Sequence, residues 1–172
     1  PPPEEARPGG PVSEYRLVLI LTIDQFRANY LDRFAPVFQG GLAWLAEQGV
    51  LFVDGHQDHA VTNTGPGHAS ISTGAYPSRS GIITNQWFDK QRRVSMYCVG
   101  DANWPLIGSP GPSGRSPNNL KVSALPDWMK QQWPGSKAFT ASYKDRAAIL
   151  LGGHGADGAY WYSDGDFVTS TY

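Results

Sequence analysis

The chain has 172 residues, of which 40% are hydrophobic and 12% aromatic, so it is long and apolar enough to form one folded core. Its net charge of −1 excludes a general attraction to nucleic acid or to an anionic membrane surface. The single cysteine, Cys98, excludes an internal disulfide, and the longest apolar run, residues 17–21, is too short to span a bilayer.

The first part of the chain predicts a leader followed by a βαβ unit. Residues 1–14 are proline-rich and polar, and we expect a flexible leader with a processed or trimmed N-terminus. Residues 16–23 are nearly all apolar, which is typical of a strand buried on both faces of a parallel sheet. Residues 41–48 predict a helix that ends at Gly49, and residues 50–53 predict a second strand. Strand, helix and strand in this order predict a βαβ unit.

Asp24 directly follows the first predicted strand. In open α/β sheets ligands bind at the carboxyl ends of the strands, so a carboxylate at this place is well positioned for chemistry. The alternative is that Asp24 caps the turn that follows. Both interpretations stay open at this point.

Three possible metal ligands lie close together at His56, Asp58 and His59. Their spacing matches no standard zinc pattern, so a metal site here is the less favoured interpretation.

Thr64 lies at the predicted start of a tightly packed helix. The helix runs from Gly67 to Thr73, with Pro66 in its first turn and Gly74 as its left-handed terminator. Free backbone N–H groups and the helix dipole make such a start a site for anions. Thr64 could simply cap the helix, or its hydroxyl could act as a nucleophile.

The remainder of the chain predicts short elements separated by turns and by a glycine-rich loop that lacks the phosphate-binding GK[ST] ending. The expected elements are a β-hairpin over 82–99, a long loop over 100–119, a helix over 126–132, a strand over 137–143, a helical turn over 147–151, and a hairpin over 160–169 with an Asp-Gly turn.

Polar groups at three predicted strand or helix ends would converge on one edge of a doubly wound sheet. Asp24 and Thr64 offer a carboxylate and a hydroxyl oxygen, which can ligate a metal ion. Asn85, Lys144 and Arg146 offer donors for a phosphoryl group. The combination indicates phosphoryl transfer, with a metal that makes the hydroxyl reactive.

The residues that carry this chemistry resemble the alkaline phosphatase superfamily. The similarity lies in Ile23-Asp24 after an apolar strand, the block TNTGPGHAS at 62–70, residues 81–87 with Asn85, and Tyr-Lys-Asp-Arg at 143–146. Within the superfamily the chain is most similar to the branch shared by type I phosphodiesterases/nucleotide pyrophosphatases and threonine-nucleophile bacterial alkaline phosphatases of the PhoK and PafA type. The resemblance runs from about residue 16 to the end of the chain.

The resemblance implies a fold and a role for each residue. The fold would be α/β, with a mostly parallel sheet flanked by helices and a β-hairpin excursion. Asp24 and Thr64 would ligate one of two Zn²⁺ ions, and Thr64 would form a phosphothreonine intermediate. Asn85, Lys144 and Arg146 would bind phosphate oxygens. Additional Ca²⁺ or Mg²⁺ is left open, and the family resemblance implies a periplasmic or secreted protein.

One feature departs from the family, which takes its other metal ligands from Asp and His pairs well downstream. Nothing here matches them, and His154 and Asp157 lie in a loop that the family uses for neither zinc ion. We therefore expect residues 15–172 to be the N-terminal part of a single alkaline-phosphatase-like domain, inactive as a segment alone.

Three functions remain to be compared. The leading hypothesis is hydrolysis of small-molecule phosphate monoesters, because the resemblance implies that a Lys-x-Arg pair such as Lys144 and Arg146 separates monoesterases from diesterases. The alternative is a phosphodiesterase or nucleotide pyrophosphatase on the same fold. The third is a non-catalytic domain in which Asp24 and Thr64 only cap turns.

Overall fold

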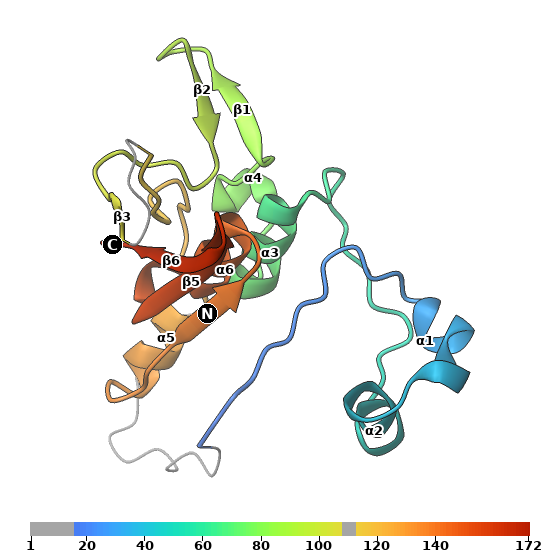
Figure 1. Ribbon diagram of the computed structural model, residues 1–172. Coiled ribbons are helices and arrows are strands. Elements are labelled where there is room, and N and C mark those ends of the chain that lie inside the picture. Colours follow the sequence, from blue (N-terminus) through green and yellow to red (C-terminus); the bar gives the residue numbers. More distant parts are fainter. Residues whose placement is uncertain (1–15, 108–112) are drawn as a thin grey trace, which may run out of the picture.

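The computed structural model describes residues 16–107 and 113–172, and Figure 1 shows that they form two unlike parts. Residues 16–62 form the N-terminal arm, an extended chain whose short helices lie away from the sheets and core. Residues 63–172, the body, hold the sheets and the core. The leader predicted over 1–14 lies outside the described residues.

The arm contains one of the predicted elements. Helix α2 spans Gly41–Gln48 and ends at Gly49, as predicted, and two shorter helices precede it, α1 at Tyr30–Arg33 and η1 at Ala35–Val37.

The two strands predicted in the arm, over 16–23 and 50–53, are wrong for this structure, and with them the βαβ unit. Both segments are without regular secondary structure, and their apolar side chains are exposed, Leu19 by 79% and Val53 by 88%. The physical reason is that a strand is stabilised by hydrogen bonds to a neighbour, and neither segment meets one among the described residues.

The elements of the body follow the predicted order, with a two-residue strand inside the predicted loop 100–119 and two short helices in addition. They are α3 at Thr64–Thr73, α4 at Pro77–Ser80, β1 at Gln86–Asp89, β2 at Val94–Tyr97, β3 at Leu106–Ile107, α5 at Leu125–Gln132, β4 at Phe139–Ser142, α6 at Asp145–Gly152, η2 at Gly153–Gly155, β5 at Gly158–Ser163 and β6 at Asp166–Ser170.

The strands form two sheets. The hairpin β1–β2 stands apart from the main sheet, as the predicted excursion requires, and the main sheet has the order β3-β6-β5-β4. The α/β class is confirmed, but among the described strands only β4 and β5 pair in parallel, whereas β6 is antiparallel to both neighbours. For β5 and β6 the reason is the tight Asp164-Gly165 turn, with both φ angles positive, because a two-residue hairpin can join only antiparallel strands.

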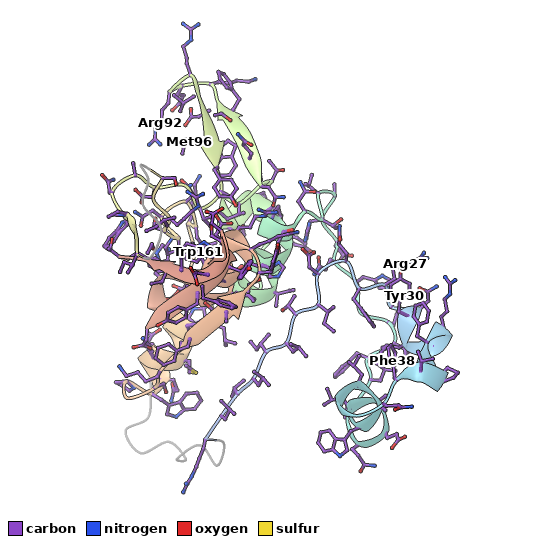
Figure 2. All side chains as sticks on the ribbon, in the orientation of Figure 1. Arg27, Tyr30, Phe38, Arg92, Met96 and Trp161 are labelled. Carbon is purple, nitrogen blue, oxygen red and sulfur yellow. The ribbon has the colours of Figure 1, made fainter. Side chains whose placement is uncertain are left out.

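The core of the body lies between the main sheet and the helix pair α3 and α6. Ile149 and Leu150 of α6 are fully buried, and Trp161 of β5 packs in the same cluster. Figure 2 places Trp161 inside the body, whereas Arg27 and Tyr30 lie in the distant helical part of the arm. The small side chains of α3 allow it to approach α6, and Ser72 donates a hydrogen bond to the Leu151 carbonyl across that contact at 2.7 Å.

None of the helices in the described residues combines the length and hydrophobicity that a bilayer crossing requires.

Candidate active site

The start of α3 confirms the predicted position of Thr64. Asn63 is the N-cap in extended conformation, Thr64 is the first helical residue, and Gly74 ends the helix at a φ of 59°. His68 is buried one turn later, and its Nδ1–H donates to the Thr64 carbonyl at 2.8 Å. His68 therefore fixes the first helical turn from within.

Thr64 meets the two site residues that come from the most distant parts of the chain. Its hydroxyl Oγ1 donates to Asp24 Oδ2 at 3.0 Å, and the Lys144 ammonium lies 3.5 Å from the same carboxylate oxygen. Thr64 is buried, so its hydroxyl has few competing contacts with water. Three predicted site residues, separated by up to 120 positions, thus share one oxygen atom.

The carboxyl group of Asp24 is favoured in its charged form. Partial burial acts to raise its pKa, but the hydrogen bond from Thr64 and the charge of Lys144 outweigh burial, so the pKa lies below its ordinary value. Asp24 is therefore an anion at neutral pH, which suits either a cation or a hydroxyl donor.

Asn85 lies directly before β1 and contacts the start of α3. Its Oδ1 accepts a hydrogen bond from the Gly65 N–H at 2.7 Å, which leaves the Nδ2 group as its donor. Because Asn85 occupies the Gly65 N–H and Pro66 has none, the start of α3 offers fewer free backbone donors to an anion than the sequence alone suggests. The remaining hydrogen bonds to an anion must therefore come from side chains such as that of Asn85.

Arg146 lies in the first turn of α6, two residues after Lys144. Its Nη1 donates to the Tyr97 hydroxyl at 3.0 Å. In the described residues no hydrogen bond joins Arg146 to Asp24 or Thr64. Sequence reasoning missed Tyr97, because it lies far from Arg146 along the chain and belongs to no recognised motif.

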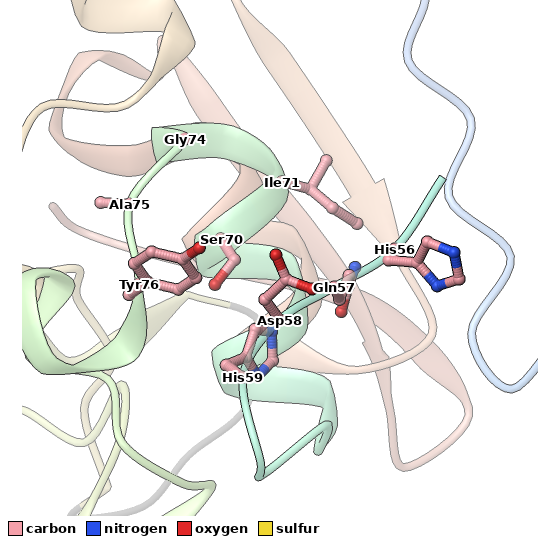
Figure 3. Close-up of a pocket in the computed structure, with 9 residues that line it drawn as sticks. All are labelled: His56, Gln57, Asp58, His59, Ser70, Ile71, Gly74, Ala75 and Tyr76. Atoms are coloured by element: carbon pink, nitrogen blue, oxygen red, sulfur yellow. The ribbon is translucent and has the colours of Figure 1, made fainter. Parts of the chain in front are cut away.

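The other candidate ligands of the sequence do not form a metal site in the described residues, where no three His, Cys, Asp or Glu side chains cluster. His56 pairs with Asp54 at 2.7 Å, and His59 donates to the Val61 carbonyl at 3.1 Å. Both line a cavity of about 290 Å³ beside α3, together with Ser70 and Tyr76 (Figure 3).

His154 and Asp157 are occupied by structural contacts. His154 donates to the Leu120 carbonyl at 2.9 Å, and Asp157 pairs with Lys130 at 2.6 Å and with Lys137 at 3.0 Å. His154 thus joins η2 to the segment before α5, and Asp157 joins α5 to the segment before β4.

Asp24 and Thr64 alone among the predicted residues fit a metal. A carboxylate oxygen and a hydroxyl oxygen 3.0 Å apart are donors that zinc accepts. Two oxygen donors are fewer than the three or four protein ligands that a zinc site needs, so these two residues alone do not complete one.

Comparison with known proteins gives consistent matches over most of the chain. Residues 18–172 match the family model for type I phosphodiesterase / nucleotide pyrophosphatase. Alkaline phosphatase PhoK of Sphingomonas sp is 40% identical over 85% of this chain and 26% of its own length. Alkaline phosphatase PhoV of Synechococcus elongatus is 42% identical over 94% of this chain and 30% of its own length.

The fold also matches a solved structure. The crystal structure of wild-type alkaline phosphatase PafA superposes with a TM-score of 0.84 at 38% identity, over 87% of this chain and 30% of that chain. The chain thus spans 26–30% of the length of these three relatives.

Proposed function

The chain belongs to the type I phosphodiesterase/nucleotide pyrophosphatase family of the alkaline phosphatase superfamily, and on that premise we propose that the full-length protein hydrolyses phosphate monoesters with Thr64 as nucleophile. The observation that carries the proposal is the contact of Thr64 Oγ1 with Asp24 Oδ2 at 3.0 Å, with Lys144 on the same oxygen. Asn63, not Thr64, holds the N-cap position of α3, so capping does not account for a carboxylate and an ammonium at this hydroxyl.

The chain's own residues divide the work as follows. The Thr64 hydroxyl loses its proton to solvent and its oxygen bonds to phosphorus as the bond to the leaving-group oxygen breaks. Water then attacks phosphorus, the bond to Thr64 breaks, inorganic phosphate leaves and Thr64 regains a proton. Asp24 holds the hydroxyl in place by accepting its hydrogen bond. Asn85, Lys144 and Arg146 donate to the phosphoryl oxygens, whose negative charge the two cations offset.

Asp24 and Thr64 would hold one of two zinc ions, and further ligands would have to come from residues beyond the pair described here. When bound, zinc lowers the pKa of a hydroxyl and stabilises the charge that develops on phosphorus-bound oxygens. The donor chemistry of the pair supports this assignment, because zinc is commonly bound by oxygen as well as nitrogen and sulfur ligands.

The proposal extends to the context of the protein. Residues 15–172 form part of a single domain, the substrates are small-molecule phosphate esters, and the protein works in the periplasm or outside the cell. Activity recovered in the exported fraction of its host would support the last point, and activity confined to the cytosol would contradict it.

The first test replaces the nucleophile in the full-length protein. Thr64→Ala should lower turnover of an aryl phosphate at least about a thousandfold, because the covalent step is lost, while the melting temperature stays within a few degrees. Thr64→Ser is the matched control, since it keeps a hydroxyl and should retain part of the activity. Full activity in Thr64→Ala would contradict the proposal, and loss of both activity and folding would favour a purely structural role.

The second test separates the monoesterase from a diesterase of the same family. Lys144→Ala should lower the rate on an aryl phosphate by about ten- to a hundredfold, the range expected for one charge-assisted hydrogen bond. The rate on an aryl phosphodiester should fall much less, because a diester carries less charge. A wild-type protein that strongly prefers the diester would reverse the order of the two functions.

A further inference from the structure

The Arg146 guanidinium is held by a hydroxyl from a different part of the chain. Its Nη1 donates to Tyr97 Oη at 3.0 Å, and Tyr97 ends strand β2 of the excursion hairpin. Arg146 Nε is buried and has no hydrogen-bond partner among the described residues. The contact with Tyr97 thus fixes one edge of the guanidinium and leaves other donors for a ligand.

Tyr97 is itself held on two sides. Its hydroxyl donates to Asp145 Oδ1 at 2.6 Å, and Asp145 Oδ2 accepts a hydrogen bond from Arg115 Nε. The Arg115 guanidinium also lies over the Tyr97 ring, 5.1 Å from its centroid. These contacts leave the phenol little freedom to rotate away from Arg146.

The chemistry of the groups fixes the direction of each hydrogen bond. The Asp145 carboxylate can only accept and the Arg146 guanidinium can only donate, so the single proton of Tyr97 points to Asp145 and a lone pair faces Arg146. Burial, followed by the hydrogen bond to Asp145, raises the pKa of Tyr97, so the phenol stays neutral at working pH. A neutral Tyr97 that donates to Asp145 and accepts from Arg146 is therefore the favoured hydrogen-bond arrangement.

The same hairpin connects this network to the start of α3. The Cys98 N–H, next to Tyr97, donates to the Asn85 carbonyl at 3.0 Å, and the Asn85 side chain accepts from Gly65. The base of the hairpin β1–β2 therefore carries both Asn85 and the residue that orients Arg146.

We propose that Tyr97 is a positioning residue that sets the Arg146 guanidinium for a phosphate group at the Thr64 site, with Asp145 and Arg115 fixing Tyr97 in turn. The proposal rests on the proposed function for the identity of the ligand. It assigns the excursion hairpin a task, namely to hold two phosphate donors, Asn85 directly and Arg146 through Tyr97.

The test is a double-mutant cycle on the full-length, zinc-loaded protein, read by calorimetric binding of inorganic phosphate and by kinetics on an aryl phosphate. Tyr97→Phe should weaken phosphate binding and lower kcat/KM by about tenfold, as loss of one positioning hydrogen bond predicts. Arg146→Ala should weaken both further. In the Arg146→Ala background, Tyr97→Phe should have no additional effect, because it acts only through Arg146.

Two further variants separate positioning from folding. Tyr172→Phe is the matched control, since Tyr172 packs on the same core and its buried hydroxyl has no partner among the described residues, and its effect should stay within about twofold. Arg115→Lys should reproduce a weaker form of the Tyr97→Phe defect, about two- to threefold, again only when Arg146 is present.

The outcomes distinguish this inference from the proposed function. If the wild type binds phosphate and the effects of Tyr97→Phe and Arg146→Ala on that binding are coupled, but the protein does not turn over the aryl phosphate, then positioning by Tyr97 is supported and the proposed phosphatase activity is refuted. If the wild type turns over the aryl phosphate but Tyr97→Phe binds phosphate as tightly as the wild type, positioning by Tyr97 is refuted and the phosphatase activity stands. The same conclusion follows if the losses in the double variant are the sum of those in the single variants. Absence of phosphate binding by the wild-type protein would overturn both.

Discussion

The arm and the body differ in what holds their apolar residues. Both contain segments of comparable hydrophobicity, yet Ile149 in the body is fully buried, whereas Leu19 and Val53 in the arm are largely exposed. The body has strands next to strands and α3 packed on α6, and the arm has no strand of its own among the described residues. Hydrophobic pattern alone is therefore not sufficient for a strand, because the neighbour that completes its hydrogen bonds is also required.

The same contrast divides the candidate site. Thr64, Asn85, Lys144 and Arg146 lie at the ends of body elements, and each has its place set by packing or hydrogen bonds there. Asp24 comes from the arm and reaches the site through its contacts with Thr64 and Lys144. The body thus fixes Thr64, Asn85, Lys144 and Arg146. Asp24 is held by its contacts with two of these residues, Thr64 and Lys144.

The largest expected effect compares one isoleucine from each part. Ile149→Ala should lower the free energy of unfolding of the 172-residue chain by about 2–5 kcal/mol, the usual result of emptying a buried site. Ile20→Ala should cost less, about 1 kcal/mol, because Ile20 is 46% exposed and has only about half of its surface to lose from burial. Urea unfolding followed by tryptophan fluorescence measures both values.

The difference between Ile149→Ala and Ile20→Ala also depends on which residues pack against the arm. Equal losses for the two variants would show that the arm packs as tightly as the body and would break the comparison. If the full-length protein provides a neighbouring strand for residues 16–23, Ile20→Ala should become much more costly there than in the 172-residue chain. The change between the two contexts would measure how much of the arm's stability is supplied by other residues.

A smaller effect is expected from one glycine in each part. A Cβ added to Gly65 would lie 3.0 Å from Asn85 Oδ1 and 3.2 Å from Cys98 Sγ, so Gly65→Ala must displace the amide that accepts from Gly65 itself. We expect a loss of about 1–3 kcal/mol, in the range of overpacked sites. A Cβ on Gly41, the first residue of α2, would meet nothing within 4 Å, so Gly41→Ala should stabilise by up to about 1 kcal/mol.

Thermal unfolding of the two glycine variants measures these shifts, and activity of the full-length protein gives an independent reading. Gly65→Ala should also lower the rate on an aryl phosphate, because Asn85 loses its position, whereas Gly41→Ala should leave that rate unchanged. A Gly65→Ala variant as stable and as active as the parent would show that the contact of Asn85 with α3 is loose.

The accuracy of the sequence interpretation follows the same boundary between arm and body. In the body, the Asp164-Gly165 turn, the left-handed Gly74 and the Pro-led start of α5 are local signals, and the predicted hairpin and helices are confirmed there. In the arm, α2 is confirmed because a helix satisfies its own hydrogen bonds. The predicted strands depended on distant partners, which periodicity cannot reveal.

The site shows the same limit. Thr64 and Lys144 lie at the ends of body elements, as the sequence predicts, whereas Asp24 meets them at one oxygen although the strand predicted before it is not formed in the described residues. Tyr97 and Arg115 carried no such signal, since their function depends on side chains that meet only after β2 and α6 have packed together.

The smallest expected effect compares one acidic residue from each part. In the body, Asp157 accepts hydrogen bonds from Lys130, the Ala138 N–H and Lys137, which hold its pKa well below the usual range. In the arm, Asp54 pairs with His56, and both side chains are largely exposed. An exposed pair of this kind contributes little to stability.

Acid should therefore separate the two acidic residues. Because the folded pKa of Asp157 lies below its unfolded value, its contribution to stability is complete above about pH 4 and is lost as pH falls through the folded pKa. Asp157→Asn should lower the urea midpoint at pH 7 and flatten its decline below pH 4, whereas Asp54→Asn should leave the whole profile of the chain unchanged. Parallel profiles for Asp157→Asn and the parent would show that the lysines do not hold the Asp157 carboxylate in solution. An altered profile for Asp54→Asn would show that the arm, too, is stabilised by its ion pairs, and the two parts would then differ in degree rather than in kind.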